Sequence, residues 1–287
     1  MKETTAQFNG FQFNNNTVLG RRRFKAPFTY KDSLINEARL IHIFSGYSTL
    51  NCAGKIINLK PGDTLIMKAD NFVNQWQKRE NNNVDFVGFR LTQPLIQTLY
   101  KDNIPSQFIL NSLDTSLAKV ESAHLLSQSA LMNNFFASLR DYIEQRDVMT
   151  EAMVGLKLRE LIELMLWQDK DKQLALLLKQ IFVPNQPKLQ EVVHQHICSP
   201  LKVEELAFLC HMSTSTFNRK FKQIYGTSAN KYLNTKRLEK AKSLITSSDK
   251  SLTEIALQCG YEESSYFSKS FKQFYGTSPS DYRKQAT

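Results

Sequence analysis

The chain has few of the residues that mark a secreted, membrane-spanning or metal-binding protein. It contains four cysteines without CxxC spacing and five histidines among 287 residues. Residues 1–20 are polar and rich in asparagine, and no apolar run approaches the roughly 20 residues that cross a bilayer. We therefore expect a reduced, cytoplasmic protein with no signal peptide, disulfide framework or membrane segment.

Motifs for catalysis are missing as well. The sequence has no P-loop, no nucleophile elbow and no paired catalytic carboxylates. His42 is the single histidine in the strand-rich part, and one imidazole cannot form a closed metal site. His194 and His196 have HxH spacing, but they lie on a helix-like segment where we expect both to face solvent. We predict that the protein is not an enzyme and has no catalytic residue, metal or cofactor.

A passage that occurs twice is the most informative feature that is present. Ser213–Tyr232 and Glu263–Tyr282 align at an offset of 50, with ten of twenty positions identical. Each copy predicts a short helix, a tight turn and a second helix that ends at a glycine, Gly226 or Gly276, where positive φ is favoured. Hydroxyl side chains at the start of each second helix are good N-caps. The repeat therefore predicts two helix-turn-helix motifs.

The second helix of each copy has an apolar face and a polar face. Phenylalanines recur at i and i+4, which predicts packing on the preceding helix. The opposite face carries hydroxyl, amide, guanidinium and ammonium groups, which read base edges and hold phosphates. An ordinary solvated helix could show the same residues once, but two matched copies favour DNA contact. The predicted contacts are Ser215, Asn218, Arg219 and Lys222 in the first copy, and Ser264, Ser265, Ser268, Lys269 and Lys272 in the second.

Residues 189–287 resemble the double helix-turn-helix DNA-binding domain of AraC/XylS-type bacterial transcription regulators. The residues that carry the resemblance are Ile255-Ala256, Gly260-Tyr261, Ser265-Tyr266-Phe267, Phe271-Lys272, Gly276, Ser278-Pro279-Ser280 and Tyr282-Arg283. Two departures are Tyr261, where phenylalanine is usual, and His211, where a glycine is usual, so we expect strain in the first turn. The resemblance implies two recognition helices in successive major grooves. Ser215, Asn218 and Arg219 match the base-reading positions of the first, and Ser264, Ser265, Ser268 and Lys269 match those of the second.

A connecting helix is predicted over residues 229–245, with an apolar stripe on one side and lysines and arginines on the others. Arg237 belongs to this basic set, and we expect it near the phosphate backbone, although a solvated face would fit equally well. From residue 185 onward there are fifteen Lys and Arg against nine Asp and Glu, a net charge of +6 of the whole chain's +10. This excess favours a polyanionic partner but does not by itself separate DNA from a membrane surface.

The first part of the chain predicts a different fold. Short segments rich in β-branched and aromatic residues alternate with turn signals between residues 8 and 91. The strand predictions are residues 38–44, 55–59, 64–67 and 84–89. Residues 59–64 resemble a turn of cupin-like sensor domains, which many regulators of the family carry. We therefore predict an α+β protein with a cupin-like barrel over about 8–91 and helices over about 92–183, together forming a sensor and dimerisation domain over residues 1–183.

Helical periodicity covers residues 122–145, 151–168 and 171–182. The middle segment is apolar on most of its circumference and so requires more than one neighbour. Helices at this position often join two subunits in the family, and packing on the barrel is an equally good explanation. The dimer-interface prediction names Leu158, Leu161, Ile162 and Met165. Pro184 and Pro187 indicate an interdomain linker over residues 184–188.

What the first domain senses is left open by the sequence. A small-molecule effector in the barrel is one hypothesis, with Arg39, His42 and Trp76 as candidate pocket residues. A regulatory protein partner is a second, and a role in dimerisation alone is a third. The basic run 21–25 is interpreted as a supplementary phosphate contact or, more often in such runs, as solvated charge.

The combined prediction is a bacterial transcription regulator that binds promoter DNA, works as an activator, contacts RNA polymerase and forms a homodimer. A repressor of the same family is one alternative. A ligand-binding or protein-interaction module that has lost specific DNA reading is another.

Overall fold

The computed structural model divides the chain into two compact units, residues 1–185 and 186–287. The structure describes residues 7–80, 82–101, 103–108, 121–168, 177–178, 181 and 187–286. Residues 184–186 of the predicted linker and most of the predicted helix 171–182 lie outside the described residues. Within the described residues, no helix is long and apolar enough to cross a membrane.

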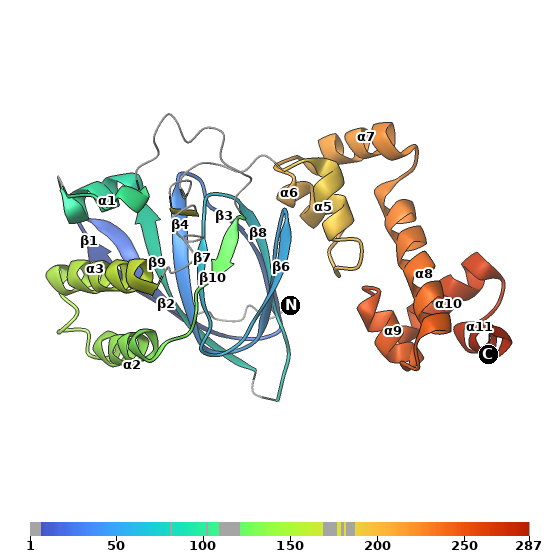
Figure 1. Ribbon diagram of the computed structural model, residues 1–287, viewed down its shortest axis with the longest axis horizontal. Coiled ribbons are helices and arrows are strands. Elements are labelled where there is room, and N and C mark those ends of the chain that lie inside the picture. Colours follow the sequence, from blue (N-terminus) through green and yellow to red (C-terminus); the bar gives the residue numbers. More distant parts are fainter. Residues whose placement is uncertain are drawn as a thin grey trace. The chain divides into compact units, whose positions relative to one another are not determined.

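Two antiparallel sheets form the centre of the first unit (Figure 1). The six-stranded sheet has the order β1-β2-β9-β4-β7-β10, and the four-stranded sheet has the order β3-β8-β5-β6. The strands are β1 (Gln7–Phe13), β2 (Asn16–Lys25), β3 (Phe28–Ser33), β4 (Glu37–Ser45), β5 (Ser48–Cys52), β6 (Lys55–Leu59), β7 (Thr64–Met67), β8 (Asn71–Trp76), β9 (Asn83–Thr92) and β10 (Ala123–Leu125). The four predicted strands correspond to β4, β6, β7 and β9 and are confirmed.

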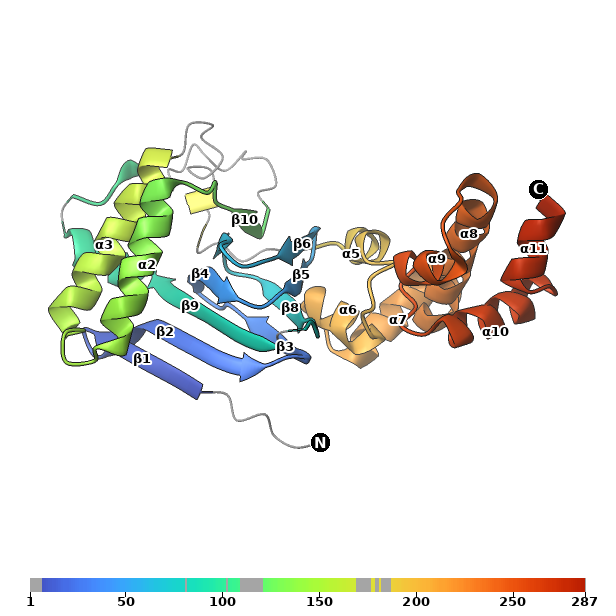
Figure 2. The same ribbon diagram turned by 90° about the horizontal axis from the view of Figure 1, so that it is seen from below.

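The cupin-like barrel is not confirmed, because the described strands form two separately hydrogen-bonded sheets and not one closed sheet. The central strands β4 and β7 of the six-stranded sheet are buried on both faces. Alternate residues such as Leu40 and Phe89 pack on helices, whereas Ile41 and Phe86 face the four-stranded sheet. The first unit is therefore layered as helices, a six-stranded sheet and a four-stranded sheet, an arrangement visible in Figure 2.

Three helices cover the outer face of the six-stranded sheet: α1 (Gln93–Tyr100), α2 (Ala130–Glu144) and α3 (Glu151–Gln168). A 3-10 turn, η1, spans Ser106–Phe108. The helix predicted over residues 122–145 begins later than expected. Residues 123–125 instead pair with β7 as β10, and Ser129 caps α2 by accepting a hydrogen bond from the Met132 amide at 3.2 Å.

The predicted dimer interface is corrected by the packing of α3. All four of its residues lie in the core of their own subunit, each with at most 1% of its surface exposed: Leu158, Leu161, Ile162 and Met165. Their side chains are unavailable to a second subunit. The large apolar side chains that α3 exposes are Leu156 and Trp167.

The second unit contains only helices among its described residues, and both predicted helix-turn-helix motifs are confirmed. Its helices are α5 (Leu189–Gln195), α6 (Val203–Leu209), α7 (Thr214–Tyr225), α8 (Ala229–Ser247), α9 (Leu252–Gln258), α10 (Ser264–Tyr275) and α11 (Pro279–Ala286). The first motif is α6 and α7, and the second is α9 and α10. Gly226 and Gly276 end α7 and α10 with φ of 70° and 78°. His211 takes φ of 55° in the first turn, the left-handed conformation that favours glycine, as expected from its position.

Two expectations for this unit were wrong. His196 is fully buried, and its Nδ1 lies 3.0 Å from the Ser199 hydroxyl oxygen, so only His194 of the HxH pair faces solvent. The N-cap of α10 is Glu263, not one of the two serines that follow it, and the Glu263 side chain makes no cap hydrogen bond.

His42 is packed between the six-stranded sheet and α2. Its ring stacks on Phe136 with centroids 3.8 Å apart, and its Nδ1 lies 2.9 Å from the Thr64 hydroxyl oxygen. Burial lowers the pKa of His42 to about 4 because the charged form is poorly solvated there. His42 is thus a neutral core residue of the first unit.

This burial predicts a pH-dependent stability. Between the ordinary pKa near 6.5 and the folded value near 4, the unfolded chain takes up a proton at His42 that the folded chain does not, so stability rises with pH in that range. Lowering the pH from about 7.5 to about 5 should remove about 2 kcal/mol from the free energy of unfolding. Urea unfolding followed by tryptophan fluorescence measures this, because both tryptophans, Trp76 and Trp167, lie in the first unit.

The matched variant is His42→Gln, which keeps a polar planar side chain and cannot titrate. The difference between the pH slopes of the two proteins isolates the contribution of His42. If the free energy of unfolding has the same pH dependence in both proteins, that result would contradict the assignment of His42 as a buried neutral residue.

Candidate functional site

The polar face of α7 points away from the core of the second unit. Phe217 and Phe221 are fully buried on one side. The other side exposes Ser215, Asn218, Arg219 and Lys222. Within the described residues, Arg219 and Lys222 have no carboxylate partner, so both carry uncompensated positive charge. The Ser213 hydroxyl caps the start of the helix by accepting a hydrogen bond from the Thr216 amide at 3.2 Å.

The corresponding face of α10 has a different charge. Ser264, Ser265, Lys269 and Lys272 are exposed, and Ser268 is half-buried. Two carboxylates that sequence reasoning passed over, Glu262 and Glu263, are exposed just before the helix, and the Ser265 hydroxyl donates to Glu263 at 3.4 Å. Their position next to the predicted N-cap was the feature of the sequence that could have identified them.

The two motifs therefore differ in net charge although their architecture is the same. Residues 202–226 contain four Lys and Arg against two Asp and Glu, a net of +2. The equivalent residues 252–276 contain two against three, a net of −1. The first motif is the more strongly attracted to a polyanion.

Helix α8 connects the two motifs, with α7 near one of its ends and α10 near the other (Figure 1). Leu238, Ala241 and Ile245 form its buried side and pack with the second motif. Lys231 and Lys240 are exposed. Lys236 pairs with Glu239 at 2.7 Å, and the Lys242 ammonium lies 5.2 Å from the centre of the Tyr275 ring.

Arg237 is the one predicted DNA contact that the structure directs inward. Its guanidinium donates to three backbone carbonyl oxygens: Ile197 at 2.6 Å, Ser199 at 2.7 Å and Gly260 at 3.2 Å. Burial lowers its pKa from the ordinary value, although the side chain keeps its charge. These contacts occupy the guanidinium, so we remove Arg237 from the predicted phosphate contacts.

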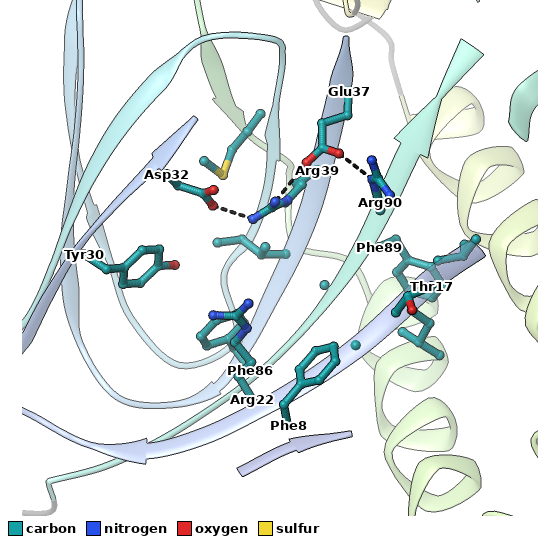
Figure 3. A pocket seen from close by; sticks show the side chains of 16 residues that line it. Phe8, Thr17, Arg22, Tyr30, Asp32, Glu37, Arg39, Phe86, Phe89 and Arg90 are labelled. Carbon is teal, nitrogen blue, oxygen red and sulfur yellow. Dashed lines mark hydrogen bonds and ion pairs between the residues drawn. The ribbon is translucent and has the colours of Figure 1, made fainter. Parts of the chain in front are cut away.

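A cavity of about 350 Å³ lies in the first unit, lined by residues of both sheets (Figure 3). Its walls are largely apolar and include Phe86, Phe89, Ile41 and Met67. Gly20 and Gly88 face each other on β2 and β9, and Gly88 in turn pairs with Ile41 on β4. Because a glycine inside a strand has no side chain, Gly88 leaves a hollow over the middle of the sheet, and the Phe8 ring packs over Gly20 at its edge.

Charged groups line the same cavity (Figure 3). Arg39 pairs with Asp32 and also with Glu37 at 2.8 Å, and the other carboxylate oxygen of Glu37 binds Arg90. Burial raises the pKa of Asp32 from its ordinary value, and Arg39 opposes that change. Arg22 has no carboxylate partner within the described residues, and its guanidinium lies 5.4 Å from the centre of the Phe8 ring.

Tyr30 adds a hydroxyl group to the cavity lining. Its burial raises the pKa to about 12, so the phenol stays protonated and can donate a hydrogen bond. The cavity thus combines apolar walls, one unpaired guanidinium and one neutral donor.

Of the three pocket residues that the sequence suggested, only Arg39 lines this cavity. His42 packs against α2, and Trp76 belongs to the core between the sheets, stacked on Phe86 at 5.4 Å. The lining residues Arg22, Glu37 and Arg90 were missed, and Gly20 and Gly88 inside strands were the signal that could have revealed the hollow.

The basic run 21–25 forms part of β2, where Arg22 and Lys25 are exposed and Arg21 and Arg23 are held by ion pairs. Arg21 is buried and binds Asp85 at 2.6 Å and Glu144 of α2 at 2.7 Å. Arg23 also binds Glu144, which lowers the pKa of that carboxyl group. Across the described ranges, no group of three or more His, Cys, Asp or Glu residues is placed to hold a metal ion.

Two known families match the chain. Residues 206–285 match a helix-turn-helix domain, and residues 38–177 match the ExsA N-terminal regulatory domain. The first match covers the second helix-turn-helix motif and all but the first three residues of the first. The second spans most of the strands and helices of the first unit.

Individual proteins show the same relationship. The transcriptional regulator ExsA of Pseudomonas aeruginosa is 28% identical over 111 residues, which cover 39% of this chain and 40% of ExsA. The transcriptional activator RhaS of an Enterobacter species is 28% identical over 182 residues, 60% of this chain and 62% of RhaS. RhaS of Klebsiella pneumoniae is 36% identical over 74 residues, 26% of this chain and 27% of RhaS. The matches thus span from about a quarter to less than two thirds of the length of these relatives.

Proposed function

Because the chain belongs to the AraC family of helix-turn-helix transcription regulators, we propose that it binds promoter DNA sequence-specifically and regulates transcription. In this proposal α7 and α10 enter two successive major grooves. The observation that carries it is the repeated motif at the two ends of α8, each copy with a buried aromatic face and an exposed polar face.

The two recognition helices would contribute unequally. Arg219 can donate two parallel hydrogen bonds to a guanine, whereas Lys269, its counterpart in α10, offers a flexible point charge. Glu263 at the start of α10 can accept a hydrogen bond from the N4 amine of cytosine, but it repels phosphate. We propose that α7 supplies most of the affinity and that α10 adds selectivity.

Regulation would act through the first unit. Activation by contact with RNA polymerase is our preferred outcome, since the RhaS relatives carry the name activator, and a repressor is the alternative. A homodimer remains part of the proposal, on a surface other than the one first predicted. We likewise propose that the two sheets form a cupin-like domain and that the DNA-binding part begins at about residue 189.

The cavity favours a small-molecule effector as the signal. A ligand of its size with an apolar body and one anionic group would place that group on Arg22 and Tyr30 and its body against the phenylalanines. The neighbouring arginines are held by Asp32 and Glu37, which leaves Arg22 as the cation available to a ligand.

Base reading by α7 predicts distinct effects for two neighbouring substitutions. Arg219→Ala should weaken binding to the preferred site by about 1–3 kcal/mol and relax the preference at one base pair. Lys222→Ala should weaken binding to all sequences alike and lower the salt slope by about 1. Fluorescence anisotropy with the preferred duplex, its single-base variants and unrelated DNA at several salt concentrations distinguishes the two effects.

Both side chains are exposed, so neither change should disturb folding, and thermal unfolding is the check. Lys269→Ala tests the second helix in the same assay. If Arg219→Ala and Lys269→Ala both leave affinity and preference intact, the alternative of an interaction module without DNA reading takes the place of this proposal.

The cavity predicts binding of an apolar anion, and 8-anilinonaphthalene-1-sulfonate is a suitable fluorescent probe. One probe molecule should bind per chain. Arg22→Ala should weaken its binding about tenfold, because a charge-assisted hydrogen bond is lost. Gly88→Val should abolish binding, because the valine side chain would fill the hollow. The protein should tolerate the change, since a Cβ at this position would lie 3.4 Å from Ile41 and 3.6 Å from the Leu40 carbonyl oxygen, which are ordinary contact distances.

The matched control is Lys25→Ala, which removes an exposed cation from the same strand and should leave the affinity unchanged. Equal loss in Lys25→Ala and Arg22→Ala, or persistence of binding in Gly88→Val, would show that the probe binds elsewhere.

A further inference from the structure

Arg237 joins parts of the second unit that are distant in sequence. Two of its three carbonyl acceptors, Ile197 and Ser199, lie in the segment that leads from α5 into α6 and thus belong to the first half. The third, Gly260, lies in the turn of the second motif. Arg237 itself is on α8, between the two motifs, so one planar guanidinium bonds to both halves at once.

The backbone at this junction is closely packed. A Cβ on Gly260 would lie 2.4 Å from the carbonyl oxygen of Cys198, and Gly260 has φ of 83°. The second motif's turn is therefore in direct contact with the first half. Close contact of this kind requires glycine for both conformation and space.

The surrounding residues hold the junction in place. The Tyr261 hydroxyl donates to the side-chain oxygen of Asn234 on α8 at 2.9 Å. His196, fully buried, contacts the Ser199 hydroxyl and so fixes the segment whose carbonyls Arg237 binds. In the first motif the position equivalent to Gly260 is His211, which is exposed.

We propose that Arg237 is a positioning residue for DNA reading: its three hydrogen bonds lock the two halves at a fixed angle about α8, which sets the spacing of half-sites that α7 and α10 can read together. A guanidinium suits this role because its donors are fixed in one plane. Lysine at the same position would present a compact ammonium that cannot span three separated carbonyls with the same geometry.

The inference rests on the proposed function for its DNA test, which uses the full chain and a bipartite site. One inserted base pair turns a half-site by roughly 35° about the duplex axis. The wild type should lose binding sharply when the spacer gains or loses one base pair. Arg237→Met should bind the native spacing at least about tenfold more weakly, because the second half-site is met at a lower effective concentration.

The same variant should respond little to the altered spacers, and it should keep the wild-type affinity for the first half-site alone. Arg237→Lys should be intermediate between the wild type and Arg237→Met in both affinity and spacer dependence. Lys236→Met is the control, since Lys236 is adjacent on α8 but pairs with Glu239 on the surface. The inference is overturned if the affinity of Arg237→Met depends on spacer length as strongly as that of the wild type. It is also overturned if Arg237→Met loses affinity for the first half-site alone as much as for the bipartite site, which would mean that Arg237 supports folding of the first half.

A second measurement does not depend on DNA. Spin labels on Lys220→Cys and Gln273→Cys, both exposed positions of the recognition helices, report the distance between α7 and α10 by double electron–electron resonance. Cys198→Ser removes the one native cysteine that is not buried. We expect a narrow distance distribution with Arg237 and a broad one with Arg237→Met.

Equal widths would overturn the lock even if DNA binding is confirmed. A narrow distribution that broadens in the variant, together with no sequence preference of the wild type on DNA, would instead leave the lock intact and refute the proposed function.

Discussion

Burial of two phenylalanines beneath each recognition helix is the constraint on which the second unit depends. Phe217 and Phe221, like Phe267 and Phe271, have no exposed surface. Since each of them is fixed inward, the remaining positions of the helix are fixed outward, and those are the positions with hydroxyl, amide and cationic groups. The same aromatic packing thus provides both stability and the presentation of a reading face.

The two halves differ in chemistry although they share this architecture. The exposed residues Glu262 and Glu263 precede α10, whereas Met212 and Ser213 occupy the equivalent positions before α7. An arrangement in which one helix supplies affinity and the other selectivity makes the angle between the two helices important. The carbonyl contacts of Arg237 give that angle a physical basis, since they join both halves to one side chain of α8.

The repeat made the second unit largely predictable from sequence, because its helix ends depend on local signals such as Ser213, Gly226 and Gly276. The inward turn of Arg237 was not predictable, because it depends on carbonyl groups about 23 to 40 positions away. In the first unit, strands with β-branched residues were found, but the division into two sheets depends on long-range pairing. The burial of the predicted dimer residues has the same cause: an apolar helix face does not reveal what covers it.

The most direct test of the account is selection of binding sites from random duplex DNA by the full chain. We expect two short conserved motifs whose centres are one helical turn apart, about 10–10.5 base pairs, with guanine at a strongly conserved position of the first. Enrichment of a single motif would contradict joint reading by α7 and α10. An unenriched pool would contradict sequence-specific DNA binding altogether.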